Sequence, residues 1–329
     1  MKATKRQFGE KTGFTIIELL TVMSIIIILI SVLVPGLNLA RRYAKRVKQK
    51  AQFHSISVAL EQFSADHDGY PESGLLPVPP VAPYTTGAQR LAEALMGRDR
   101  RGYDTKSSWD AQADSLDVTI YANDPLTVDG KASLDRRKEG PYLPDAAAFQ
   151  VSELYGDATT PHAGNVYGGP NIKNLIPRPA PVLTDEYTVK NITTLSGKVV
   201  KAGSPVLYYK ANSSTVFPDT SGGGVINILD TGPVGGPPGA NDSIINSIDN
   251  EELIALGTVK SGVSVLHHFN PAFPDPVVAG KFGRQIFYEA ITNTQMKPSW
   301  PVNTDSYILI SAGFDGIFGT PDDVFNFGE

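Results

Sequence analysis

The chain has 329 residues, enough for one large domain or two modest ones with a sizeable buried core. Its formal net charge is −5, and without residues 1–13 it would be −8. This balance argues against a general nucleic-acid binder, which would carry a basic domain. Cysteine is absent, so no disulfide can brace the fold. The 31 glycines and 25 prolines exceed the usual share of roughly 12 % and predict many loops and turns.

A predominantly apolar run of 21 residues extends from Phe14 to Val34. As an α-helix rising about 1.5 Å per residue, it would be roughly 30 Å long, which matches the hydrocarbon core of a bilayer. The run contains one charged residue, Glu18. Because a charge at membrane depth costs on the order of 3 kcal/mol, the sequence predicts a partner for this carboxylate.

A local motif lies at the start of this run: Gly13-Phe14-Thr15-Ile16-Ile17-Glu18-Leu19-Leu20. It resembles the cleavage and methylation site of type IV pilin-like proteins, and Pro35 falls where that family usually has a proline. The resemblance covers residues 1 to about 70 and implies that a leader, 1–13, is removed by a prepilin peptidase. It further implies an N-methylated Phe14 and an inner-membrane helix over 14–34, with a cytoplasmic N-terminus and a periplasmic head.

Two other membrane interpretations fit this N-terminus less well. A secretory signal peptide has an apolar region of about 7–15 residues followed by a small-residue cleavage site, and this run is longer and lacks that site. A plain signal anchor fits the length but leaves Glu18 unexplained. Cleavage after Gly13 would keep the helix on the mature chain and create an α-amine on Phe14, four residues from Glu18.

Three arrangements could satisfy Glu18. The carboxylate could pair with the Phe14 amine of its own chain, because residues four apart share one face of a helix. The resemblance implies instead that it pairs with the N-terminal amine of a neighbouring subunit and brings that subunit into register in a filament. The remaining alternative is that the carboxylate snorkels to the nearby membrane interface.

A cluster of basic residues follows the apolar run closely: Arg41, Arg42, Lys45, Arg46, Lys48 and Lys50. By the positive-inside rule alone, this side of the helix would be cytoplasmic. The prepilin motif predicts the opposite topology, because the leader is cleaved on the cytoplasmic face and the head is exported. The cluster would then meet anionic headgroups or acidic residues of adjacent subunits, or form a solvated helix face.

The membrane helix is expected to continue as an amphipathic helix over 35–68. Pro35 predicts a kink or a melted turn, since proline removes a backbone hydrogen bond and the glycine that follows weakens the same turn. An apolar stripe then recurs at helical spacing: Phe53, Ile56, Leu60 and Phe63. This stripe predicts a face that packs on the head. Asp68-Gly69-Tyr70-Pro71 predicts the end of the helix, with the glycine as its C-cap.

The rest of the chain, 69–329, is expected to form an α+β head in which an antiparallel β-sheet packs on the long helix. A helix is predicted from Gln89 to Met96, ended by Gly97. Further helices are predicted at 145–154, 249–256 and 284–294. Strands are predicted at 116–121, 187–193, 205–210, 225–229, 263–268 and 307–311.

The segment 307–327 is rich in glycine and aspartate and predicts a metal loop. Carboxylates held close together repel one another unless a cation lies between them, and hard oxygen ligands suit calcium. The spacing differs from an EF-hand but resembles the calcium loop of the major pseudopilin of type II secretion. That resemblance assigns four ligands: Ser311, Asp315, Asp322 and Asp323. The alternative is a turn whose carboxylates accept backbone hydrogen bonds.

No sequence motif argues for catalysis. The H-E-x-x-H, G-x-S-x-G and P-loop patterns are absent. His267 and His268, at the end of a predicted strand, would point to opposite faces, which is poor geometry for holding one metal ion. Satisfied or solvated histidines are therefore expected.

The sequence predicts a structural subunit that assembles through its N-terminal helix into a pseudopilus or pilus, in the first place that of a type II secretion system. The implied partners are copies of itself, other pilin-like subunits, the prepilin peptidase, the inner membrane, and an assembly platform with its ATPase; no nucleic acid is expected. Two alternatives stay open. One is a minor pilin whose enlarged head binds a secreted substrate, a surface or DNA, and the other is a membrane-anchored periplasmic enzyme.

Overall fold

A computed structural model describes residues 13–74, 85–107, 121, 125–137, 140–144, 146–156, 180–187, 190–212, 244–259, 265–276, 281–293, 295 and 300–328. Within these residues the chain is α+β, with a long N-terminal apolar helix, several short helices and small antiparallel sheets. The chain divides into two compact units, Met1–Lys45 and Arg46–Glu329. The boundary lies inside the long helix, so the second half of that helix belongs to the same unit as the head.

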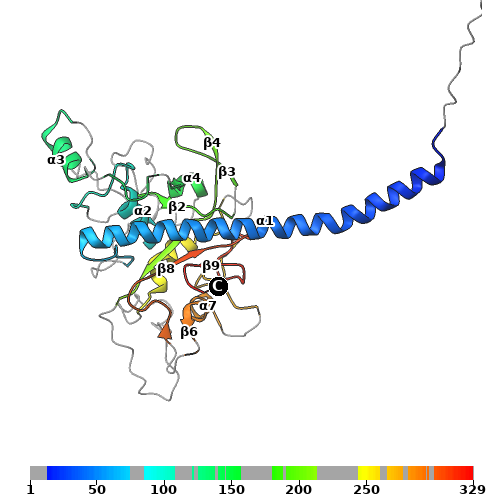
Figure 1. Ribbon diagram of the computed structural model, residues 1–329. Helices are drawn as coiled ribbons and strands as arrows, with labels where there is room; N and C mark the ends of the chain where they lie inside the picture. Colours follow the sequence, from blue (N-terminus) through cyan, green and yellow to red (C-terminus); the bar gives the residue numbers. More distant parts are fainter. Residues whose placement is uncertain are drawn as a thin grey trace, which may run out of the picture. The chain divides into compact units, whose positions relative to one another are not determined.

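Helix α1 extends from Ile16 to His67, and its predicted end is confirmed (Figure 1). The helix continues through Pro35, so the melted turn expected there is wrong. Proline removes only the bond to the Ser31 carbonyl, and the bonds on either side keep the helix continuous. A kink at Pro35 stays a prediction.

The C-terminal end of α1 differs in detail from the expected glycine cap. Asp68 is the residue in the left-handed conformation, with φ of 57°. The N–H of Gly69 then donates to the carbonyl of Ser64 at 3.2 Å. This bond, between residues five apart, is typical of a Schellman motif. In this helix the left-handed position is Asp68, and the glycine follows it. Aspartate tolerates this conformation better than most residues, which explains the shift by one position.

Helix α2, Gly87–Met96, confirms the helix predicted from Gln89. It begins two residues earlier because Thr86 and Gln89 form a capping box, in which each side chain bonds the other's backbone. Gly97 ends the helix with φ of 74° and donates its N–H to the backbone carbonyl of Glu93 at 2.8 Å. A left-handed backbone of this kind favours glycine.

The other described helices are short: α3 Val128–Arg136, α4 Val151–Tyr155, η2 Ser247–Asn250, α6 Glu251–Ile254 and α7 Gly283–Ile291. The helix predicted at 249–256 is confirmed. The one predicted at 284–294 is confirmed up to Ile291, where strand β6, Thr292–Asn293, follows. The one predicted at 145–154 is confirmed only at its end, because its first part contains strand β1, Ala148–Phe149. Helix α3 is not predicted from the sequence. It begins directly after its N-cap residue, Thr127.

The largest described sheet has three antiparallel strands in the order β5 (Leu207–Lys210), β8 (Tyr307–Ser311) and β9 (Val324–Phe325). The remaining described strands form antiparallel pairs: β1 with β2 (Val182–Leu183), β3 (Lys190–Thr193) with β4 (Val199–Ala202), and β6 (Thr292–Asn293) with β7 (Trp300–Pro301). The strands predicted at 205–210 and 307–311 are confirmed. The one predicted at 187–193 is confirmed over Lys190–Thr193, whereas Tyr187 lies in a bend.

The strand predicted at 263–268 is wrong in its described part, 265–268, which forms no strand. Val265 and Leu266 are exposed there, and His267 turns into the interior. A short apolar run looks like a strand in sequence, but only a neighbouring strand can make it one. The strand predicted at 225–229 lies outside the described residues, as does the one at 116–121 except for Tyr121.

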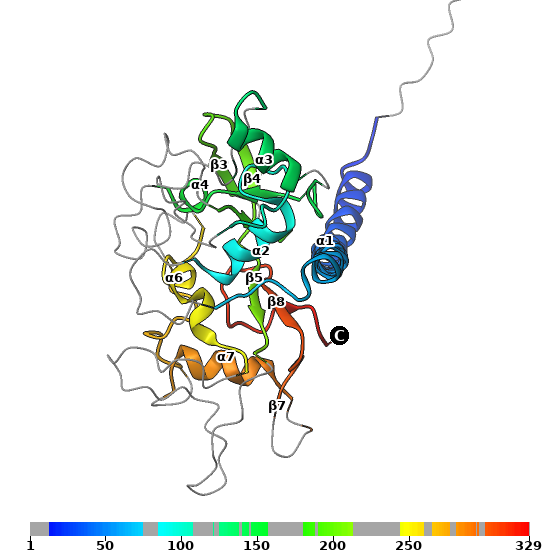
Figure 2. The same cartoon turned by 90° about the vertical axis from the view of Figure 1, so that its left-hand side faces the viewer.

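Strand β8 lies at the centre of the head's core. Ile308 and Ile310 pack with α7 and α6, whereas Tyr307 and Leu309 pack with α1 and α2. This alternation follows from the two-residue period of a strand. The predicted apolar stripe of α1 is confirmed. Its four residues are buried with Tyr307 and Leu309, on the side of β8 that faces α1 and α2: Phe53, Ile56, Leu60 and Phe63. Figure 2 shows α1 beside β5 and β8, as the prediction of a sheet packed on the long helix requires.

Candidate functional site

The first candidate site is the N-terminal motif. Gly13, Phe14 and Thr15 precede the first helical residue, Ile16, and the Phe14 side chain is 85 % exposed. The backbone N–H and the hydroxyl of Thr15 both donate to Oε2 of Glu18, at 2.9 and 2.8 Å. The N–H of Glu18 donates in return to the Thr15 hydroxyl at 3.2 Å. Thr15 and Glu18 therefore form a capping box at the start of α1.

This arrangement adds a fourth way to satisfy Glu18. The carboxylate sits at the N-terminus of the helix, where unpaired N–H groups favour negative charge. The T-x-x-E spacing of Thr15 and Glu18 is the sequence signature of such a cap, which is neither a charged partner nor the membrane interface. Glu18 remains exposed and accessible to another chain.

The first half of α1 is long and apolar enough to cross a membrane. Its most apolar 18-residue window has a mean hydropathy of 2.8, and none of that window is buried by the rest of the described chain. In a soluble protein, an apolar helix of this kind would be covered by its own core. Length and composition therefore support a membrane span over this segment.

The second candidate site is the C-terminal acidic loop between β8 and β9. Oδ2 of Asp322 accepts the backbone N–H groups of Phe314 and Asp315, at 2.6 and 3.1 Å. Oδ1 of Asp322 accepts the hydroxyl of Thr320 at 2.6 Å. Gly313 allows this close approach: its φ is 64°, and a Cβ there would lie 2.3 Å from the Asp322 carbonyl oxygen.

Two of the other predicted calcium ligands, Asp315 and Asp323, also accept backbone N–H groups of the loop. Asp315 accepts the N–H of Ile317 at 2.7 Å, and Asp323 accepts that of Gly319 at 2.7 Å. The Ser311 hydroxyl points elsewhere and donates to Asp185 at 2.7 Å. The loop thus brings the three aspartates together through its own backbone, as the alternative to the metal interpretation expected.

The three carboxyl groups differ in their affinity for protons. Burial raises the pKa of Asp323 well above its usual range, and burial together with the nearby Asp322 raises that of Asp315. Burial also acts on Asp322, but the hydrogen bonds from Thr320 and the backbone outweigh it and lower the pKa. The loop therefore keeps Asp322 charged and favours protons on its neighbours.

The fit of this loop to calcium is incomplete. Within the described residues, no group of three or more histidine, aspartate or glutamate side chains is arranged to hold a metal ion. Asp323 Oδ1 is nevertheless buried without a hydrogen-bond partner in the described chain, which is an oxygen that a cation could use. Calcium binding stays a prediction that requires Ser311 and Asp315 to turn toward this oxygen.

His267 and His268 contact this loop, and neither points to a metal site. His267 is buried, and its Nδ1 accepts the N–H of Phe318 at 3.1 Å. Burial lowers the pKa of His267 to about 4, so its ring is neutral at ordinary pH. The ring of His268 stacks on Phe273 with ring centres 4.2 Å apart.

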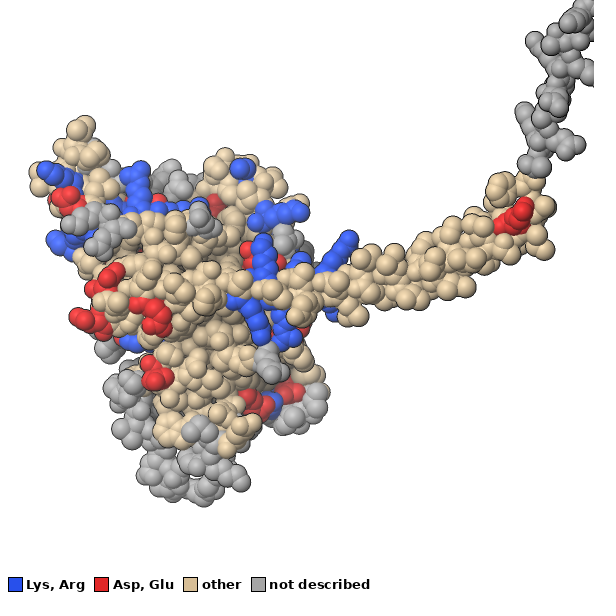
Figure 3. Space-filling view, viewed as in Figure 1, with Lys and Arg blue, Asp and Glu red and all other residues tan. Residues whose placement is uncertain are grey.

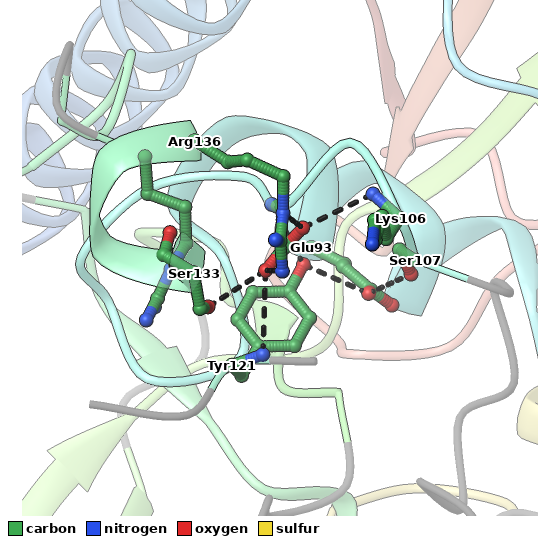
Figure 4. A network of polar contacts seen from close by, with 8 residues as sticks. Glu93, Lys106, Ser107, Tyr121, Ser133 and Arg136 are labelled. Atoms are coloured by element: carbon green, nitrogen blue, oxygen red, sulfur yellow. Dashed lines mark hydrogen bonds and ion pairs between the residues drawn. The ribbon is translucent and has the colours of Figure 1, made fainter. Parts of the chain in front are cut away.

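A buried polar network beside α2 was not predicted from the sequence. Glu93 and Asp104 are both fully buried. Glu93 accepts the Tyr121 hydroxyl at 2.9 Å, forms an ion pair with Arg98 at 3.1 Å and accepts the Ser107 hydroxyl. Figure 4 shows Glu93 of α2, Ser133 and Arg136 of α3, and Tyr121 from the segment between them pointing toward one another.

Asp104 occupies the other half of the network. It binds the guanidinium of Arg136 through two hydrogen bonds, at 2.6 and 2.8 Å, and accepts the Ser133 hydroxyl at 2.7 Å. Burial acts to raise the pKa of Asp104, but Arg136 and the other donors outweigh it and lower the pKa. A buried charge is tolerated when it is paired and hydrogen-bonded in this way. The network fastens α3 to α2 in a chain that has no disulfide.

Comparison with protein-family models, with curated proteins and with solved structures found no match for this chain.

Proposed function

We propose that the chain is a structural subunit of a pilus-like filament, processed by a prepilin peptidase and assembled through α1. The observation that carries the proposal is the start of α1. A capped carboxylate, Glu18, stands at the head of a helix whose next turns are apolar and exposed, directly after Gly13 and Phe14. An apolar helix without cover needs either lipid or other helices around it.

In this function, cleavage after Gly13 releases an amine on Phe14, which is then methylated. The segment 14–34 holds the subunit in the inner membrane, with the leader in the cytoplasm and the head in the periplasm. Other copies, other pilin-like subunits and an assembly platform with its ATPase complete the system, for which we propose type II secretion. No catalytic role is assigned to the chain.

Leader removal is tested by changing Gly13 to Ala in cells that contain a prepilin peptidase. Wild-type protein is expected to run as a shorter chain that begins at Phe14, and Gly13→Ala as the full-length chain. Gly36→Ala is a matched control, because an added Cβ meets nothing within 4 Å at either glycine. Mass spectrometry of intact protein reads the result, and a wild-type chain that still begins at Met1 refutes processing.

The role of the Glu18 charge is separable from its role as a cap. Glu18→Gln keeps an oxygen that can accept from Thr15 but removes the charge, whereas Thr15→Ala removes the cap hydroxyl and keeps the charge. If the charge directs assembly, Glu18→Gln should lose filament cross-links while remaining in the membrane, and Thr15→Ala should retain them. Undiminished cross-linking of Glu18→Gln contradicts the docking role.

One observation favours the second candidate, a minor subunit whose head binds another molecule. Leu126 and Val128, on either side of the α3 cap, expose 93 % and 86 % of their surface. Apolar side chains this exposed at a projecting end suit a contact with a partner. Copy number separates the candidates: a major subunit dominates sheared filaments by quantitative mass spectrometry, and a minor subunit is rare in them.

A further inference from the structure

The second half of α1 has an outward face as well as the stripe that packs on the head. Small and apolar residues lie along it in one row, spaced four and seven residues apart: Val47, Ala51, Val58 and Ala65. Val47 and Val58 are 51 % and 46 % exposed. Residues at such spacings share one side of a helix, so this row lies opposite the buried stripe.

Charges of opposite sign flank the two ends of this row. Lys48 and Lys50 lie at its N-terminal end, Glu61 and Asp66 at its C-terminal end, and all four are exposed. The ten residues from Ala51 to Leu60 include no charged residue other than a histidine. Figure 3 shows the resulting separation, with basic side chains gathered along one stretch of α1 and acidic ones toward its C-terminal end.

Among these four charges, Lys48 is used within the head, where it forms an ion pair with Glu186 at 2.8 Å. Glu61 accepts the hydroxyl of Tyr70 at 2.7 Å, and Asp66 accepts that of Tyr142 at 2.8 Å. Neither carboxylate forms an ion pair with a described residue, and Lys50 has no ion-pair partner among them either. A carboxylate can accept about four hydrogen bonds, so both acids can also accept from a lysine of another chain.

We propose that this face of α1 docks a second copy of the chain, parallel to the first and displaced along the helix by about 24 Å, or 16 residues. The displacement places Lys50 of one copy beside Asp66 of the other. Two copies in register would place like charges side by side, which is unfavourable. The inference rests on the proposed function, because anchoring in one membrane is what makes the two copies parallel.

Disulfide trapping tests the displacement in a chain that has no cysteine of its own. The full-length variant with both Lys50→Cys and Asp66→Cys should form a ladder of multimers upon oxidation in membranes. Within one chain these positions are about 24 Å apart, whereas a disulfide needs Cα atoms within roughly 7 Å, so every bridge joins two copies. The matched control, Lys50→Cys with Val58→Cys, should give no ladder.

Formaldehyde treatment of the wild-type protein separates failure of this inference from failure of the proposed function. Trapped multimers without a Lys50–Asp66 ladder would refute the docking face and leave filament assembly standing. The absence of multimers in both experiments would refute assembly itself, and the inference with it. A ladder of equal strength from the Lys50–Val58 control would refute the displacement.

Charge reversal gives a second readout. Lys50→Glu and Asp66→Lys should each reduce formaldehyde multimers at least about threefold at low salt, since exposed pairs are weak singly but repulsion repeats at every subunit. The two reversals together should restore the wild-type level. Equal loss in the double variant would refute pairing of these two side chains.

Discussion

Asp249 is a carboxyl group whose surroundings oppose its charge. It is buried against the segment that follows α1, and Ser73 donates a hydrogen bond to it at 2.6 Å. Burial raises the pKa of Asp249 to about 7, although Ser73 and the nearby Arg90 act in the other direction. In an unfolded chain the same group would titrate near 3.9. Folding is therefore linked to proton uptake at this residue.

Asp249 is predicted to make the head less stable as pH rises. Because the folded pKa is the higher one, its contribution to stability is fully present below pH 4 and is lost as pH rises through 7. The free energy of unfolding should fall by up to about 4 kcal/mol over this range. Asp249→Asn mimics the protonated acid and should lack this dependence. Urea titrations of the full chain in detergent at several pH values measure the difference.

Calcium removal gives a prediction at the acidic loop. If the loop binds the ion, a chelator should lower the melting temperature of the wild-type protein by several degrees, since a site filled at 100 times its Kd adds about 2.7 kcal/mol. Asp322→Ala should not respond. Asp305→Ala, at an exposed aspartate outside the loop, should respond like the wild type. A wild-type head that melts identically with and without chelator contradicts the metal.

At the scale of elements, α1 joins two environments in a single helix. Its first half is exposed and apolar, whereas five apolar residues of its second half are buried with α2 and β8. The sequence predicts both halves, because a continuous apolar run changes there to apolar residues at helical spacing. The capping box at Thr15 has a sequence signature too, the T-x-x-E spacing of Thr15 and Glu18.

The contribution of the second half of α1 to the stability of the head is measurable. Leu60 is fully buried, so Leu60→Ala should lower the free energy of unfolding of the head by about 2–5 kcal/mol, the range for leucine in a packed core. Val58→Ala, two residues away on the exposed face, should change it by less than about 0.5 kcal/mol. Equal effects of the two substitutions would contradict the packing of α1 on the head.

Strand pairing was harder to predict than helices. The sequence predicts strands at 205–210 and 307–311 but does not predict that they pair with each other, because pairing depends on residues distant in sequence. The run at 263–268 has the same local character and no strand forms in its described part. The buried network shows the same limit, since Glu93, Asp104 and Arg136 become partners only when α3 folds back to α2.

At the scale of the whole molecule, the buried network of Glu93, Asp104 and Arg136 braces a head that has no disulfide. Removing one side of it should be costly. Asp104→Asn removes the negative charge that pairs with Arg136 and should lower the free energy of unfolding by about 3–5 kcal/mol. Adding Arg136→Gln should recover part of the loss. Asp129→Asn, at an exposed position of α3, serves as the control in thermal unfolding of the full chain.

The position of β8 also has a consequence for biosynthesis. This strand touches both groups of core residues, yet it is synthesised after α1, α2, β5 and α7. Until then β5 lacks its neighbour in the sheet, and the apolar faces of α1 and α7 lack the strand on which they pack. During that interval the apolar side chains of both groups are incompletely covered, as in a folding intermediate. Chaperones that guard such intermediates, and proteases that remove them, would act mainly in that interval.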